Sequence, residues 1–355
     1  MKSTEDYIVQ PIPFSASAET QALINSMGAT EDLCINSDYS QLAVAGFCDH
    51  KIYLFSLEIQ LQKGVPKVSI DNPQVITSDC FNEPHGLKFI QDRYLLVGNR
   101  RGAVNLLKLP QRLEGVTEYK LDTILTLEGD KHLSVNSPGS LDCHRVKDDL
   151  YRVFVCNNYT NVVTCHEIQI CEDICLKKQG ALIKQGLDLP DGIAIDPRQE
   201  WVATSNHNTG TAQLHKLDTS LSPLTEPSCV LQGMVCPHGL NFSQNSQQLF
   251  VTDSATQYLN IYQKPNKRGW PATMKPCKTI KVMNEETYQK GRFNIQEGGV
   301  KAIDFDHANG VAILTSTHTG LKFYLLDDLL NAEALQVDEE IREKSRLRNE
   351  WLGRT

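Results

Sequence analysis

Six copies of one short strand pattern run through this sequence of 355 residues, and they constrain its fold more than any other feature. In each copy a first apolar run is followed by a second and usually a third, separated by Gly, Asn, Asp and Ser. The central apolar residues of the six first runs are Leu33, Leu87, Leu141, Ile193, Leu240 and Ile303. The copies are therefore spaced by 54, 54, 52, 47 and 63 residues.

The runs are about five to seven residues long and rich in β-branched residues, whereas helical periodicity is nearly absent before residue 325. Strand triplets that recur about every 50 residues, with room for a fourth strand, are typical of β-propeller blades. The sequence predicts an all-β, six-bladed β-propeller with four-stranded blades. We expect one domain over residues 1–326, with blade cores starting near residues 31, 85, 139, 191, 238 and 301.

Both ends of the chain have expected roles in this ring. The run Tyr7-Ile-Val-Gln-Pro-Ile-Pro-Phe14 precedes the first copy, and the sixth copy ends after Leu325. We predict that residues 7–14 close the ring as the outermost strand of the last blade, where proline is tolerated. Residues 327–355 combine apolar positions with a dense charge run and predict a C-terminal helical tail, packed on the rim or partly detached.

The longest insertion covers residues 264–298. It can be a lid over one face or a tolerated surface insertion, and loop energetics favour the second. Its segment Cys277-Lys-Thr-Ile-Lys-Val-Met is expected to return as the fourth strand of blade five.

Composition excludes several classes of function. The formal charge is -8 and no basic block is present, which argues against nucleic-acid or anionic-membrane binding. No apolar stretch approaches the ~20 residues of a membrane-spanning helix. The acidic N-terminal residues do not resemble a secretion signal, and 11 cysteines lack a Cys-x-x-Cys pair. We therefore expect a cytoplasmic protein without a disulfide framework.

The first strand of a propeller blade lines the central channel, and its first residue points toward the axis. We call the residues at this position of the six copies the mouth ring: Glu31, His85, Gly139, Asp191, His238 and Lys301. Three of them lie in nearly identical phrases, Glu83-Pro-His85-Gly, Leu189-Pro-Asp191-Gly and Cys236-Pro-His238-Gly. The same backbone position thus presents His, Asp and His in one ring.

Two imidazoles and one or two carboxylates that converge in a narrow channel suit zinc, iron or manganese, whereas calcium prefers oxygen ligands alone. Glu31, His85, Asp191 and His238 are the candidate ligands, and Lys301 could stabilise an anionic intermediate or a substrate carboxylate. A bound ion with an open coordination position would activate water or polarise a carbonyl. The alternative is purely structural: proline fixes the approach to the strand and glycine allows a tight turn.

A further set of polar residues ends the second strand of four copies: Asn99, Asn157, Asn206 and Asp253. They are secondary channel candidates. Asn and Asp also favour the turn after a strand, and this explanation is the stronger one.

The phrases Pro84-His85-Gly86-Leu87, Pro190-Asp191-Gly192-Ile193 and Pro237-His238-Gly239-Leu240 resemble those of six-bladed propellers of the gluconolactonase and regucalcin (SMP-30) type, the paraoxonases and the NHL repeats. The resemblance covers about residues 30–326. The resemblance to regucalcin-like lactonases implies that Glu31 and Asp191 of this chain hold a divalent ion. His238 stands at the position where the lactonase pattern has an Asn. The paraoxonase resemblance implies that His85 is a general base.

His85 and His238 also resemble the channel histidines that hold zinc in peptidyl-hydroxyglycine amidating lyases, although the third histidine of that family is absent. The sequence favours a metal-dependent hydrolase of a lactone or similar small ester, with zinc, manganese, iron or calcium as cofactor. The alternative is a non-catalytic propeller that binds protein partners through rim loops or the C-terminal helix. A lyase on the same channel is the third hypothesis.

Overall fold

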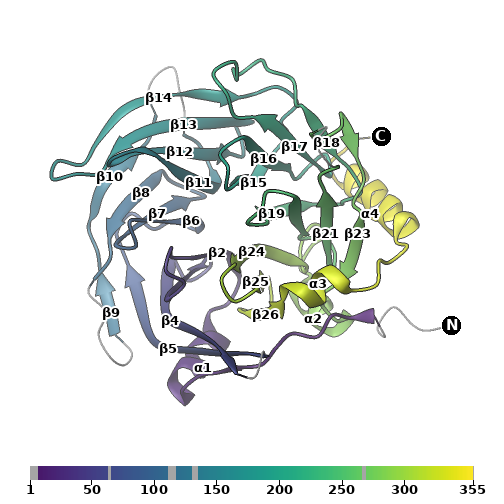
Figure 1. The fold of residues 1–355 in the computed structure, drawn as a ribbon, viewed down its shortest axis with the longest axis horizontal. Coiled ribbons are helices and arrows are strands. Elements are labelled where there is room, and N and C mark those ends of the chain that lie inside the picture. Colours follow the sequence, from purple (N-terminus) through teal and green to yellow (C-terminus); the bar gives the residue numbers. More distant parts are fainter. Residues whose placement is uncertain (1–6, 63–64, 111–116, 130–134, 266–268, 355) are drawn as a thin grey trace.

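The computed structural model describes residues 7–354, apart from 63–64, 111–116, 130–134 and 266–268. Six antiparallel sheets are arranged in a ring around a central axis (Figure 1). The predicted six-bladed β-propeller is therefore confirmed.

The first three blades follow the chain order, with the innermost strand first. Blade one contains β2 (Thr30–Ile35), β3 (Gln41–Gly46), β4 (Lys51–Gln62) and β5 (Val65–Thr77). Blade two contains β6 (Pro84–Ile90), β7 (Tyr94–Asn99), β8 (Val104–Lys108) and β10 (Thr123–Leu127). Blade three contains β11 (Pro138–Lys147), β12 (Leu150–Asn157), β13 (Val162–Gln169) and β14 (Cys175–Ile183).

The last three blades differ more in size. Blade four contains β15 (Pro190–Ile195), β16 (Trp201–Asn206), β17 (Thr211–Lys216) and β18 (Cys229–Leu231), to which β22 (Thr273–Met274) adds in parallel. Blade five contains β19 (Pro237–Phe242), β20 (Gln248–Asp253), β21 (Tyr258–Gln263) and β23 (Lys278–Lys281). Blade six has β24 (Val300–Asp306), β25 (Val311–Ser316) and β26 (Lys322–Leu325). The expected return of the insertion as the fourth strand of blade five is thus confirmed, and blade six has three strands among the described residues.

The N-terminal segment lies at the predicted edge but is not the predicted regular strand. The backbone of Ile12 forms one antiparallel bridge with Phe323 of β26. The two-residue strand β1 (Phe14–Ser15) instead pairs in parallel with β5, as β9 (Thr117–Lys120) also does. Two prolines, Pro11 and Pro13, flank Ile12 and cannot donate backbone hydrogen bonds, which limits the pairing here to one bridge.

Hydrophobic cores lie between neighbouring blades. The core that joins blade six to blade one contains Val44, Phe55, Ile313 and Phe323, with Phe14 packed against it. Packing between the first and last blades therefore completes the ring.

The chain also contains four helices in its described part: α1 (Ala18–Ser26), α2 (Glu285–Gly291), α3 (Leu326–Asn331) and α4 (Asp338–Trp351). The first two were not expected from the sequence. Helix α4 is docked on blade five, because Tyr258 Oη donates a 2.6 Å hydrogen bond to Glu340 and buried Arg348 donates to the carbonyl of Val235. The C-terminal tail is therefore attached to the rim.

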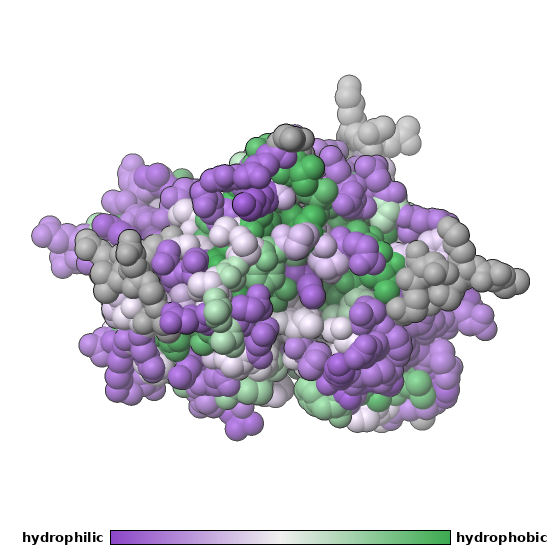
Figure 2. Space-filling model, turned by 90° about the horizontal axis from the view of Figure 1, so that it is seen from below, coloured by the Kyte–Doolittle hydropathy of each residue, from purple (hydrophilic) through white to green (hydrophobic). Residues whose placement is uncertain are grey.

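Seen from the lower edge of Figure 1, the surface is mainly hydrophilic, with smaller hydrophobic areas between the polar side chains (Figure 2). No described helix has the length and apolar character needed to span a bilayer. All eleven cysteines are free, as expected.

Candidate functional site

The structure brings the side chains of the mouth ring together. Proline begins strands β6, β15 and β19, and the residue after it is the inward-pointing His85, Asp191 or His238. The glycine that follows permits close contact between neighbouring innermost strands: a Cβ on Gly192 would lie 2.0 Å from the carbonyl oxygen of His238. The glycine of the Pro-x-Gly phrase thus allows close packing of neighbouring strands rather than the predicted tight turn, and the phrase also positions the ring.

One oxygen of Glu31 is the centre of the cluster. Glu31 Oε2 lies 3.2 Å from His238 Nε2, 3.5 Å from His85 Nε2 and 3.0 Å from Lys301 Nζ. Each of these four residues is less than a tenth exposed. The arrangement places two imidazole nitrogens and an ammonium around a single carboxylate oxygen.

Asp191 faces the same imidazoles from the opposite side. Its Oδ2 lies 3.4 Å from His238 Nε2, and its Oδ1 lies 3.8 Å from His85 Nε2. Asn158 donates a 2.9 Å hydrogen bond to Oδ1, and an Arg100 nitrogen lies 3.4 Å from the same oxygen. These partners hold an ionised Asp191 beside both histidines.

Arg100 and Asn158 were not expected from the sequence, and neither was a role for His207, whose Nδ1 lies 3.6 Å from Asp191 Oδ2. All three occupy one repeated position, directly after the second strand of a blade. The residues at this position are Phe47, Arg100, Asn158, His207, Ser254 and Thr317. An alignment of the copies one residue further would have shown this third ring.

Burial and charge determine the protonation of the cluster. Burial, together with the nearby Arg100 guanidinium, lowers the pKa of His85 to about 3, and burial also lowers the pKa of His207 to about 3. Burial alone would raise the pKa of Glu31, but Lys301 and the imidazoles outweigh it and hold that pKa well below its usual range. The pKa of Asp191 is also held low, because the neighbouring His238 and Arg100 outweigh burial. Near neutral pH, His85 and His207 are therefore neutral and lie beside ionised carboxylates.

Several nitrogens of the cluster are buried without a hydrogen-bond partner among the described residues. They are both ring nitrogens of His85, Nε2 of His238 and Nδ1 of His207. An unsatisfied buried polar atom is costly, so these nitrogens are available to a ligand or an ordered water. One ligand atom each from Glu31, His85 and His238 lies within 4.8 Å of the others, a grouping that could hold a metal ion. Neutral imidazoles and a carboxylate are the protonation states that metal binding requires.

The secondary channel candidates have a different environment. Their side-chain oxygens accept hydrogen bonds from backbone N–H groups of the loop before the innermost strand of the same blade. The pairs are Asn99 with Asn82, Asn157 with Asn136, Asn206 with Asp188, and Asp253 with Val235 and Cys236. The structure therefore gives these four residues loop-bracing contacts, and none of those contacts involves the mouth ring.

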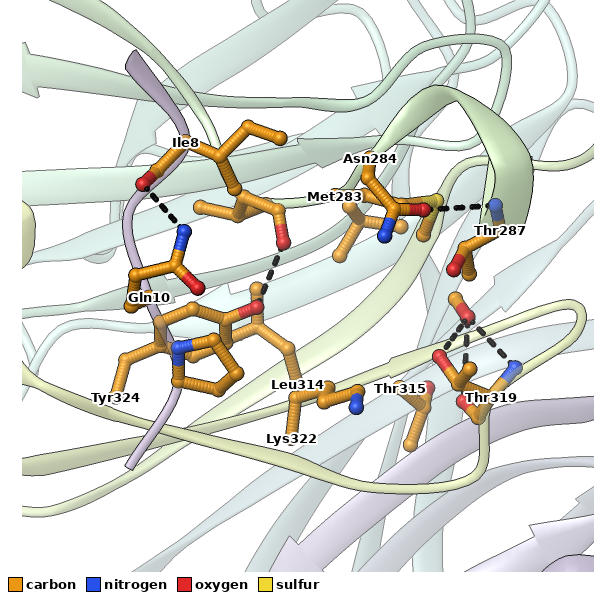
Figure 3. Close-up of a pocket in the computed structure, with 14 residues that line it drawn as sticks. Ile8, Gln10, Met283, Asn284, Thr287, Leu314, Thr315, Thr319, Lys322 and Tyr324 are labelled. Atoms are coloured by element: carbon orange, nitrogen blue, oxygen red, sulfur yellow. Dashed lines mark hydrogen bonds between the residues drawn. The ribbon is translucent and has the colours of Figure 1, made fainter. Parts of the chain in front are cut away.

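A separate pocket of about 270 Å³ lies on blade six, between the N-terminal segment and the start of α2 (Figure 3). Its lining includes Gln10, Asn284, Thr315 and Lys322. It contains no residue of the mouth ring, and the unpartnered imidazoles lie elsewhere.

Comparison with known proteins supports the fold alone. No protein-family model matches the chain, and no curated protein matches it. Among solved structures, the chain is similar to a functionally unknown protein from Desulfotomaculum acetoxidans DSM 771, with a TM-score of 0.51 and 13% sequence identity over 84% of this chain and 83% of that chain. The chain is a six-bladed β-propeller with a buried carboxylate and histidine cluster in its channel, and the resemblance to the lactonase families stays a prediction.

Proposed function

We propose that this protein is a metal-dependent hydrolase of a lactone or similar small ester, acting at the mouth of the propeller channel. The observation that carries the proposal is the buried grouping of Glu31, His85 and His238, whose facing ring nitrogens have no hydrogen-bond partner among the described residues. A platform for protein partners would need only the rim and would not require such a cluster. The small-molecule substrate and the cytoplasmic setting belong to the same proposal.

Two nitrogens and one oxygen suit zinc, manganese or iron better than calcium. When bound, such an ion lowers the pKa of water and polarises a carbonyl. Glu31, His85 and His238 would hold it, and Asp191 is the fourth candidate ligand because it faces both imidazoles. The burial of these side chains excludes bulk water and strengthens electrostatic interactions within the site.

The side chains of Arg100 and Glu297 are 22% and 17% exposed, whereas their ion-pair partners Asp191 and Lys301 are 1% and 2% exposed. They mark the side of the cluster nearest to solvent, where a substrate would approach. Arg100 supplies a cation there and also holds Asp191.

Elemental analysis combined with an ester panel tests this function. We expect about one transition-metal ion per chain, and hydrolysis of a lactone or ester that is lost in chelator and restored by zinc or manganese. His85→Gln and His238→Gln should lose both the metal and the activity. His215→Gln changes an equally buried histidine on β17 and should retain both.

The products separate the remaining hypotheses. Addition of water across the ester indicates a hydrolase, whereas elimination without net hydrolysis indicates a lyase. Folded wild-type protein that takes up no metal under any loading condition would contradict the proposal.

A further inference from the structure

The ammonium of Lys301 lies between two carboxylates. It is 3.0 Å from Glu31 Oε2 and 2.6 Å from Glu297 Oε2. Lys301 is 2% exposed, so the ion pairs are shielded from solvent. Glu297 comes from the loop before β24, and its Oε2 also accepts a 3.3 Å hydrogen bond from Thr317.

The two contacts of Lys301 are not equivalent. Both are ion pairs, but the ammonium lies closer to Glu297 Oε2, at 2.6 Å, than to Glu31 Oε2, at 3.0 Å. The same Oε2 faces the ring nitrogens of His85 and His238. Lys301 is thus paired more closely with Glu297, and it lies beside the Glu31 oxygen that would complete the proposed metal site.

A metal ion at this site and the ammonium would compete for Glu31. Both are cations, and their repulsion within a few ångströms is strong where water is excluded. Glu31 without any cation would instead be an uncompensated buried charge. The cluster therefore needs a cation at Glu31 in the metal-free protein, and that cation must be able to move away when a metal binds.

We propose that Lys301 is a built-in counter-ion that neutralises Glu31 in the metal-free protein and is transferred fully to Glu297 when a divalent metal binds. Glu297 is then a positioning residue that acts on the metal site through Lys301. The inference rests on the proposed metal site and deepens it. Lys301 was expected to stabilise an anionic intermediate or a substrate carboxylate. Its ammonium is instead paired with two carboxylates of the protein, Glu31 and Glu297.

Zinc titration of metal-free protein by calorimetry tests the exchange. Lys301→Met removes the competing cation, so it should tighten zinc binding by about tenfold or more. Glu297→Gln removes the acceptor for the ammonium, so it should weaken binding by about tenfold. The matched control is Lys88→Met, which removes an ammonium paired with Asp142 elsewhere in the channel and should change affinity by less than about threefold.

The double variant separates a role through Lys301 from a general effect of negative charge. If Glu297 acts through Lys301, Glu297→Gln has no effect in the Lys301→Met background, and the double variant binds zinc as Lys301→Met does. Equal weakening in both backgrounds would overturn the inference, as would weaker binding by folded Lys301→Met. If neither the wild type nor any variant binds zinc, the proposed metal site itself is wrong and the inference fails with it.

Discussion

Gly139 occupies the one position of the mouth ring where a side chain would collide with its neighbours. A Cβ at this residue would lie 2.8 Å from Asp191 Oδ1 and 2.8 Å from Asn158 Oδ1. Glycine leaves the space in which Asn158 donates to Asp191. Gly139, which lacks a side chain for the mouth ring, therefore leaves room for Asn158 to hold the Asp191 carboxylate.

Gly139→Ala should destabilise the protein by about 1–3 kcal/mol, because the added methyl group must displace Asp191 or Asn158. It should also weaken metal binding. Gly180→Ala is the matched control, since a Cβ there meets nothing within 4 Å, and we expect a change below about 1 kcal/mol. Urea unfolding measures the free energy of unfolding of the two variants. Equal losses of stability at the two positions would refute the steric explanation.

The repeated phrases were sufficient to place five of the interacting side chains, because one backbone position of each blade faces the axis. Arg100 and Asn158 occupy a second repeated position, directly after the second strand of each blade, which the phrases do not include, and Glu297 occupies no repeated position. These residues lie in loops, and their side chains reach the channel only through contacts with other blades. The repeat can show the shared position of Arg100 and Asn158, but which residue each side chain contacts depends on tertiary packing, as does the whole role of Glu297.

Carboxylates connect neighbouring innermost strands deeper in the channel. Asp32 of β2 accepts a hydrogen bond from the backbone N–H of Leu87, and Asp304 of β24 accepts one from Ile35. Asp142 of β11 makes the same contact with Ile195. These bonds fix the relative height of adjacent blades, on which the alignment of the mouth ring depends.

Asp32 of β2 should make the stability of the folded protein depend on pH. Burial, which outweighs two backbone hydrogen bonds, raises its pKa from 3.8 to about 7. The folded protein therefore binds this proton more tightly than the unfolded chain does, and the contribution of Asp32 to stability falls as pH rises from about 4 to 7. Asp32→Asn removes that contribution. The free energy of unfolding of the variant, relative to that of wild type, should therefore rise between pH 4 and pH 7 by on the order of 1–3 kcal/mol.

Urea unfolding at several pH values between 4 and 7.5, in chelator, measures this difference. A constant difference between Asp32→Asn and wild type would show that Asp32 titrates alike in the folded and unfolded states.

At the scale of the whole molecule, the ring depends on contacts between its first and last blades. The predicted closing strand is reduced to one bridge at Ile12, and side-chain packing takes over much of its role. The Phe14 ring lies 5.4 Å from the ring of Phe323, centroid to centroid. Hydrophobic packing therefore contributes to closure here, together with the hydrogen bond from Ile35 to Asp304.

Phe14→Ala should lower the free energy of unfolding by about 1–3 kcal/mol, since it removes a partly buried ring from this junction. Phe293→Ala removes an aromatic ring that is 73% exposed and should cost less than about 0.5 kcal/mol. Chemical unfolding compares the two variants. A Phe14→Ala variant as stable as Phe293→Ala would mean that this packing does not hold the ring closed.

The architecture was predictable because strand runs of fixed spacing leave few alternatives to a propeller. The departures from it have local causes. Helix α1 has weak amphipathic character, and α2 spans only seven residues, so neither has a strong periodic pattern. The short pairings of β1 and β22 join segments distant in sequence, and two-residue strands carry little pattern of their own.

Anomalous X-ray diffraction from crystals grown with zinc tests the central claim most directly. The account predicts a single strong anomalous peak in the channel, bounded by Glu31, His85 and His238, that is absent from crystals of His238→Gln. An ordered channel with no peak at this position, or with the zinc bound elsewhere, would contradict it.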